Sequence, residues 1–248
     1  MTTDSMTAPV AWVTGASSGM GRTSALALAE QGHPVALTAR RADQLERTAD
    51  EIRASGGSAL VVPADLSRPG TASTTVKRIA DEFGPVGVAV FSAGLNTKER
   101  MWDGLRPDEF RRILELNLSS IVEATTALLP RMREHATGQL ILISSWAAWR
   151  HSPGAGVAYA ASKTALGAIA ETLNAQEGRH GIRACHLCPG DVNTDFLDHR
   201  PTEVPAGARA QMLDPQDVSR AVAFIASSPA SVCVNELVIT PTGGGSYR

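Results

Sequence analysis

The chain has 248 residues, of which 43% are hydrophobic and 19% charged, and its formal net charge is −2. This composition lacks the basic excess of a nucleic-acid-binding domain, and no apolar run is long enough to cross a membrane. Residues 1–248 are predicted to form a single domain. The odd cysteine count and the absence of a signal-peptide pattern indicate a cytoplasmic protein without a disulfide framework.

Seven short runs rich in Val, Ile and Leu show little strict alternation, which is typical of strands buried on both faces of a parallel sheet. They are Val10–Thr14, Val35–Ala39, Ala59–Val62, Val86–Phe91, Leu140–Ser144, Ile182–Leu187 and Leu237–Thr240. Helical patterns lie between them at Arg22–Gln31, Ala42–Ala54, Pro107–Leu129, Ala155–Glu177 and Asp214–Ser227. The alternation predicts an α/β fold, doubly wound, with a mostly parallel seven-stranded sheet and helices on both faces.

Two segments fall outside this alternation. Residues 1–8 are polar, and we expect them to be disordered. The stretch Asp195–Met212 is irregular and contains Pro201 and Pro205. Long irregular loops in compact domains are usually functional, so we expect residues 195–212 to cover a substrate.

The first strand runs directly into Thr14-Gly15-Ala16-Ser17-Ser18-Gly19-Met20-Gly21, and a helix follows. Glycines let the backbone approach a pyrophosphate, and the helix N-terminus supplies free N–H groups and positive potential. A glycine-rich turn without a ligand is the alternative. The order of strand, turn and helix favours a dinucleotide cradle made by Gly15, Ser17, Ser18, Gly19, Met20 and Gly21.

The residues after the second strand bear on the choice of cofactor. The position where NAD-binding folds carry an acidic residue is Ala39, and Arg40 and Arg41 follow. A guanidinium attracts a 2′-phosphate, so the sequence predicts NADP(H) in preference to NAD(H). The alternative is that both arginines are a solvated helix start. Asp65, after the third strand, either accepts a bond from adenine or caps the helix that follows Arg68.

A tyrosine and a lysine lie one helical turn apart, at Tyr159 and Lys163, on an Ala-rich helix. A neighbouring ammonium is expected to lower the pKa of the phenol, which suits general acid–base chemistry. Ser144 and Ser145 end the preceding strand, where a hydroxyl can orient a carbonyl oxygen. Asn117 interrupts an apolar helical stretch, so its amide needs a partner, either backbone or a water.

In this order the motifs resemble the short-chain dehydrogenase/reductase family, in its single-domain branch with a Rossmann-type fold. The resemblance covers roughly Val10 to Gly244 and includes Ser92-Ala93-Gly94 and Pro189-Gly190-Asp191-Val192-Asn193-Thr194. It implies an NADP-dependent oxidoreductase that moves a hydride to or from a carbonyl or alcohol. The implied catalytic residues are Asn117, Ser145, Tyr159 and Lys163. The implied further cofactor contacts are Asp65, Leu66, Ser92, Ala93, Gly94, Tyr159, Lys163, Pro189, Gly190, Val192 and Thr194.

Three features depart from the family pattern. Ser92 stands where the family usually has an asparagine. The interval from Ser145 to Tyr159 is one residue longer than the commonest spacing, which leaves Ser144 as the alternative to Ser145. The C-terminal stretch lacks the frequent Val-Asp-Gly-Gly ending.

A catalytically silent NADP(H)-binding sensor or scaffold is the alternative function, since fold alone does not fix function.

The remaining expectations concern partners and residues without a predicted role. The resemblance implies a homo-oligomer, tetramer or dimer, packed through Pro107–Leu129 and Ala155–Glu177, where Ala165, Gly167 and Ala168 allow close approach. No metal site is expected, because alternation sends Cys185 and Cys188 to opposite strand faces. The six histidines are interpreted as surface residues. Three tryptophans, Trp102, Trp146 and Trp149, either line the substrate pocket or pack structurally.

Overall fold

The computed structural model describes residues 8–243 and contains a parallel seven-stranded sheet with the order β3-β2-β1-β4-β5-β6-β7. The strands are β1 (Val10–Thr14), β2 (Val35–Thr38), β3 (Ala59–Val61), β4 (Val86–Phe91), β5 (Gly138–Ile143), β6 (Ile182–Pro189) and β7 (Glu236–Ile239). The predicted doubly wound α/β fold is confirmed, with some strand ends shifted by a residue or two. Residues 1–8 were expected to be disordered. Of these, residues 1–7 lie outside the described residues.

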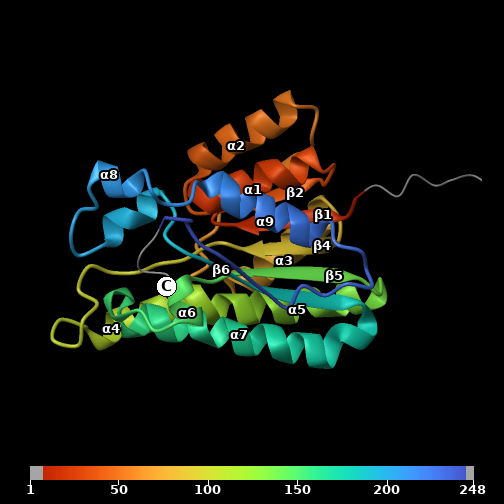
Figure 1. The fold of residues 1–248 in the computed structure, drawn as a ribbon. Helices are drawn as coiled ribbons and strands as arrows, with labels where there is room; N and C mark the ends of the chain where they lie inside the picture. The colour runs from red at the N-terminus through yellow and green to blue at the C-terminus, as the bar shows by residue number, and fades with distance from the viewer. Residues whose placement is uncertain (1–7, 244–248) are drawn as a thin grey trace, which may run out of the picture.

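Three helices cover each face of the sheet (Figure 1). One layer holds α1 (Gly19–Glu30), α2 (Ala42–Ala54) and α9 (Pro215–Ala226), and the other holds α3 (Thr71–Glu82), α5 (Ser120–Glu134) and α7 (Val157–Glu177). The strands carry apolar side chains on both faces. Each helix layer therefore packs against one face of the sheet and buries a separate apolar cluster there. The sheet is therefore a rigid platform whose carboxyl ends present the loops.

The long helix predicted at Pro107–Leu129 differs from the structure. It divides into α4 (Pro107–Leu114), a π-helical turn η1 (Glu115–Ser119) and α5, which continues past Pro130 to Glu134. Asn117 lies in the π turn and is fully buried. A π turn adds a residue to one helical turn, and such insertions occur mostly at functional sites. Apolar periodicity continues through the segment, so the pattern did not show the interruption.

The start of α3 corrects one prediction about Asp65. Its carboxylate accepts bonds from the Ser67 N–H at 3.1 Å and the Ser67 hydroxyl at 2.7 Å, and it does not cap the helix. The N-cap is Gly70, with φ of +82°. Its N–H and that of Ser73 donate to Glu123 of α5, at 3.0 and 2.8 Å. The cap comes from a distant helix, and the Asp65 carboxylate takes no part in it.

The segments beyond the carboxyl ends of the strands are short and mostly helical. They are α6 (Trp146–Trp149), the 3-10 turns η2 (Pro153–Ala155) and η4 (Asp195–His199), and α8 (Ala206–Arg209); a further 3-10 turn, η3 (Gly178–His180), precedes β6. The predicted irregular loop at residues 195–212 therefore contains η4 and α8, which project beside α1 and α9 in Figure 1. Within residues 8–243, none of the helices has the length and apolar character needed to cross a membrane.

Candidate active site

A cleft of about 310 Å³ opens where β1, β2 and β4 end. It brings together the glycine turn, the end of β2 and the segment after β4, which lie far apart in the sequence. Its lining includes the predicted residues Gly15, Ser17, Ser18, Gly19, Met20, Gly21, Arg40, Arg41, Asp65, Leu66, Ser92, Ala93, Gly94 and Thr194. Sequence analysis did not single out Thr38, Ala64 or Leu116, which also line it.

The glycine turn fits a closely approaching dinucleotide. Gly15 has φ of +68°, and a Cβ there would lie 2.9 Å from the Ala93 backbone nitrogen. A Cβ at Gly21 would lie 2.3 Å from the Gly15 carbonyl oxygen, well inside any real contact. Glycine is therefore required for the turn itself and for the start of α1. The first turn of α1 points its free N–H groups toward this cleft.

Two arginines line the cleft at the end of β2. Arg41 donates to the hydroxyls of Ser17 and Ser18, each at 3.2 Å, and both Arg40 and Arg41 are exposed. The neighbouring Ala39 offers no carboxylate to the same wall. This wall is cationic and open to solvent, which suits a phosphate group more than ribose hydroxyls.

A second cavity, of about 610 Å³, adjoins the first and shares Met20, Thr194 and Phe196 with it. Tyr159 and Ser145 both line it, and the Ser145 side chain hydrogen-bonds the Tyr159 hydroxyl. Ser145 is also the N-cap of α6, accepting from the Ala147 N–H at 3.1 Å. Its hydroxyl is thus fixed in place by the helix that it starts. The predicted Pro189, Gly190 and Val192 line the same cavity.

The neighbouring serine is placed differently. Ser144 also lines the cavity, but it is buried, and its hydroxyl donates to the Lys163 carbonyl oxygen at 3.0 Å. Ser145 is the serine whose side chain reaches Tyr159. A substrate oxygen that meets both hydroxyls therefore meets Ser145 and Tyr159.

Lys163 lies beneath Tyr159, with its side chain buried. Its Nζ donates to the Ile143 carbonyl oxygen at 2.7 Å and lies 5.9 Å from the centre of the Tyr159 ring. Burial lowers the pKa of Lys163 to about 8. The same Nζ would be 3.7 Å from a Cβ at Gly94, so it faces the segment after β4 that lines the nucleotide cleft.

The predicted effect of Lys163 on its neighbour is wrong for this structure. Burial raises the pKa of Tyr159, and the Ser145 hydrogen bond and the nearby charges of Arg100 and Arg200 oppose that rise. Two arginines from other loops thus oppose the rise, and the Asp191 carboxylate adds to it. The lysine ammonium is directed to a main-chain carbonyl instead, because the one-turn spacing sets the distance but not the direction of the charge.

Asn117 is satisfied by main chain and a hydroxyl. Its Oδ1 accepts from the Leu95 N–H at 2.7 Å, and its Nδ2 donates to the Leu95 carbonyl at 2.9 Å and to Ser162 at 3.1 Å. The amide therefore locks the segment after β4 onto α7. The expected role in holding a water near Lys163 stays a prediction.

The sequence model of the short chain dehydrogenase family matches residues 9–204. This chain belongs to that family. An uncharacterized oxidoreductase of Listeria monocytogenes is 30% identical over 93% of this chain and 95% of its own length. Glycine betaine reductase ATRR of Emericella nidulans is 34% identical over 94% of this chain, which spans only 18% of that longer protein.

Solved structures agree with the assignment. An alcohol dehydrogenase from the archaeon Thermococcus sibiricus, complexed with 5-hydroxy-NADP, superposes with a TM-score of 0.84 at 29% identity, over 94% of this chain and 97% of the other. A 3-ketoacyl-(acyl-carrier-protein) reductase from Brucella melitensis, complexed with NADH, gives 0.85 at 28% identity, over 94% and 97%. This short-chain dehydrogenase is thus an oxidoreductase of a family whose solved members bind both nicotinamide cofactors.

The tryptophans of this dehydrogenase divide between two situations. Trp146 lines the second cavity. Trp149 packs on Trp146 with 5.1 Å between ring centroids and carries the Arg150 guanidinium on its face. Trp102 is 80% exposed and does not line the cavity. One of the three predicted aromatic wall residues is therefore placed there, and Phe196 of η4, which sequence analysis did not single out, joins it.

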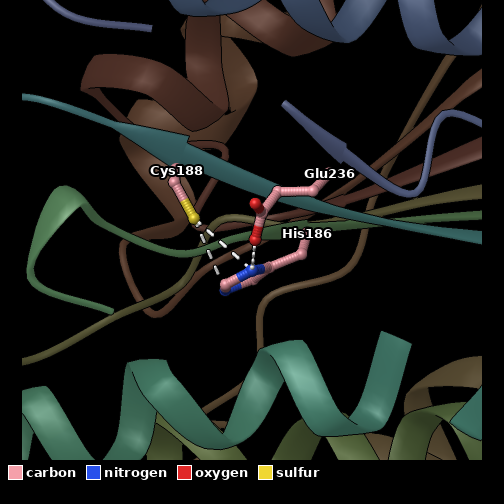
Figure 2. A group of neighbouring side chains, drawn as sticks. All are labelled: His186, Cys188 and Glu236. Carbon is pink, nitrogen blue, oxygen red and sulfur yellow. Dashed lines mark hydrogen bonds and ion pairs between the residues drawn. The ribbon is translucent and has the colours of Figure 1, made fainter. Parts of the chain in front are cut away.

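One histidine was misplaced by sequence analysis. His186 is 5% exposed, and its Nδ1 lies 3.1 Å from the Glu236 carboxylate, with Cys188 Sγ 3.5 Å from both ring nitrogens (Figure 2). Sulfur at equal distances from both nitrogens lies over the ring and not in line with a nitrogen lone pair. Burial raises the pKa of Cys188 to about 12, so the thiol is protonated at neutral pH. His186, Cys188 and Glu236 each place one possible ligand atom within 4.8 Å of the others, a grouping between β6 and β7 that sequence analysis did not single out.

Proposed function

We propose that this dehydrogenase transfers a hydride between NADP(H) and a carbonyl or secondary alcohol, with Tyr159 as the general acid and base. One observation carries the proposal: the hydroxyls of Tyr159 and Ser145 meet on the wall of a cavity that adjoins the glycine-turn cleft. A substrate oxygen held by both hydroxyls would place its carbon at the junction of the two cavities. The nicotinamide, when bound, supplies or accepts the hydride there.

The proposed proton chemistry follows from the environment of Tyr159. Burial raises the pKa of Tyr159, so the phenol carries its proton at neutral pH and can donate it to a carbonyl oxygen. Ser145 shares that oxygen and holds it in line. Lys163 and Asn117 would act from below, by fixing the floor on which the nicotinamide ribose lies.

The preference for NADP(H) rests on the cationic wall. Arg40 and Arg41 flank the cleft at the end of β2, and the side chain of Ala39 carries no carboxylate that would repel a 2′-phosphate. The Asp65 carboxylate also lines the cleft and is close enough to Arg40 for that charge to help lower its pKa. Some similar solved structures hold NADP and one holds NADH, so membership of the family does not by itself indicate which cofactor is preferred. We expect kcat/KM to be at least about tenfold higher with NADPH, since one charge-assisted hydrogen bond contributes that much. A higher kcat/KM with NADH would contradict the proposal.

The experiment that tests catalysis is Tyr159→Phe. It removes the proton-transferring hydroxyl and leaves the ring, so we expect kcat to fall by about 10²–10⁴ while NADPH binding is nearly unchanged. Turnover is measured by absorbance of the reduced nicotinamide over a panel of ketones and aldehydes, and binding by fluorescence titration. Near-normal turnover in the variant would reject the role of Tyr159. Cofactor binding by the wild type without turnover of any substrate would favour the silent sensor.

We also propose a cytoplasmic homo-oligomer that packs through α4, α5 and α7. The buried Cys185 and Cys188 are free thiols, in keeping with a reducing compartment. Ala168 is exposed on α7 and available for packing, whereas a Cβ at Gly167 would lie 3.4 Å from the His186 ring, so Gly167 faces the interior. Light scattering should give a dimer or tetramer at micromolar concentration, and a monomer would contradict this.

A further inference from the structure

Arg100 is a buried cation on the wall of the substrate cavity. It lies in the loop between β4 and α4, is 7% exposed, and lines the same cavity as Tyr159 and Ser145. Gly156, with φ of +78°, makes room for it, because a Cβ there would lie 2.6 Å from the Arg100 Cβ. The start of α7 is therefore shaped around this one side chain.

The hydrogen bonds of Arg100 leave part of its guanidinium available. Nε donates to the Thr97 carbonyl at 2.8 Å, Nη1 to the Gly154 carbonyl at 3.4 Å, and Nη2 to the His199 carbonyl. A guanidinium has five N–H donors, so these three bonds do not exhaust it. All three partners are neutral carbonyls. They hold the planar guanidinium of Arg100 in a fixed orientation between three loops.

No carboxylate neutralises Arg100 within residues 8–243. The charged or titratable groups that interact with it are Arg200, Tyr159 and His199, and none of the ion pairs of the described segment includes it. By contrast, the half-exposed Arg133 has a carboxylate partner, Glu177, at 2.6 Å. A buried cation without a counter-charge costs several kcal/mol, so a structure retains one mostly where an anion will meet it.

A second cation lines the same cavity. Arg200 ends η4 and forms an ion pair with Asp191, which belongs to the segment after β6. Its charge and that of Arg100 both act on Tyr159. The wall beside the phenol therefore carries two guanidinium groups, of which one is already paired.

We propose that the substrate of this dehydrogenase carries a carboxylate, which Arg100 binds as the main anchor with Arg200 beside it. The inference rests on the proposed hydride-transfer function and names its substrate class. Because both arginines line the same cavity as Tyr159 and Ser145, the carboxylate and the reacting carbonyl of a small substrate would lie together in it. Trp146, Phe196 and Leu197 line the rest of the cavity and favour an apolar body. The class is a short oxo acid, or the corresponding hydroxy acid, with an apolar substituent.

The first test compares acids with their methyl esters. The probes are phenylglyoxylate and 3-benzoylpropanoate, each beside its methyl ester, with NADPH. We expect kcat/KM of the wild type to favour an acid over its ester by at least about tenfold, as one charge-assisted contact implies. Arg100→Met should lower kcat/KM for the acid by about 10- to 100-fold and kcat/KM for the ester by much less. Arg100→Lys, which keeps the charge, should recover part of the preference.

Control variants separate recognition from folding. Arg78→Gln removes an exposed arginine of α3 that pairs with Glu82 and does not line the cavity, and it should leave the ratio of acid to ester unchanged. Melting temperatures show whether Arg100→Met still folds. Equal losses toward acid and ester would show that Arg100 only ties the loops together, and would overturn the proposal. A wild type that prefers esters would overturn it as well.

A binding measurement separates this inference from the proposed function. Calorimetry with benzoate and benzamide, each added to the enzyme saturated with NADP⁺, needs no turnover. We expect benzoate to bind at least about tenfold more tightly than benzamide, and Arg100→Met or Arg200→Gln to reduce that difference. If no carbonyl compound is reduced but benzoate binds through Arg100, hydride transfer fails and the anion site stands. If benzoate binding is absent or does not depend on Arg100, the anion site fails.

Discussion

The two cavities of this short-chain dehydrogenase are built in different ways. The nucleotide cleft is lined mostly by residues that closely follow β1, β2, β3 and β4. The substrate cavity is made of side chains from loops far apart in the sequence, such as Arg100, Trp146 and Arg200. The first is therefore specified by local residues such as Gly15 and Gly21, and the second by contacts that form only when distant loops meet.

A matched pair of glycine substitutions tests this difference most strongly. At Gly21 a Cβ would lie 2.3 Å from a carbonyl oxygen, while at Gly207 of α8 no heavy atom lies within 4 Å. We expect Gly21→Ala to lower the free energy of unfolding by about 1–3 kcal/mol and to weaken NADPH binding strongly. Gly207→Ala should be neutral or stabilising by a few tenths of a kcal/mol, by about the propensity difference between the residues. Denaturant unfolding and NADPH titration give both numbers, and similar values for the two variants would refute the contrast.

The buried Lys163 lies under both cavities and predicts a pH dependence. Burial lowers its pKa to about 8, from 10.5 in the unfolded chain, so below pH 8 the folded protein bears the full cost of the buried charge. Between about pH 8 and 10.5 the unfolded state binds the extra proton, so stability rises with pH. Relative to Lys163→Met, the wild type should gain up to about 3 kcal/mol across this window.

The measurement is chemical unfolding of both proteins, without added nucleotide, at several pH values. The difference between them cancels the titration of all other groups. A flat difference from pH 7 to 11 would show that the Lys163 pKa is close to that of the unfolded chain.

The smallest expected effect concerns the exposed arginines of the nucleotide cleft. Replacing Arg40 or Arg41 with Ser should raise KM for NADPH by about tenfold and change KM for NADH by less than about twofold, because only NADPH carries the 2′-phosphate. Arg47→Ser, on the exposed side of α2 and outside the cleft, is the matched control. Equal changes with both cofactors would show that these arginines do not recognise the phosphate. The effect should also shrink as ionic strength rises.

Several particular residues show where sequence reasoning succeeded and where it could not. The glycine turn and the Tyr159–Lys163 pair were found because their spacing is local. The π turn at Asn117 was missed, since the apolar pattern of a helix continues unbroken through it. Asp65 was a good local candidate for a helix cap, but Glu123, 53 residues from Gly70, takes that place. His186 was assigned to the surface although its strand is buried on both faces.

The amino-acid sequence alone determined the α/β alternation, the glycine turn after β1 and the placement of Tyr159 and Lys163 one helical turn apart, because each depends on neighbours within a turn or a strand. Only the tertiary structure decided which charges surround that tyrosine. Arg100 and Arg200 lie 59 and 41 residues from Tyr159 along the chain, on opposite sides of it, and reach one wall only because the parallel sheet gathers its loops at one edge. The charges around Tyr159 therefore depend on how distant loops pack, and no local sequence pattern predicts them.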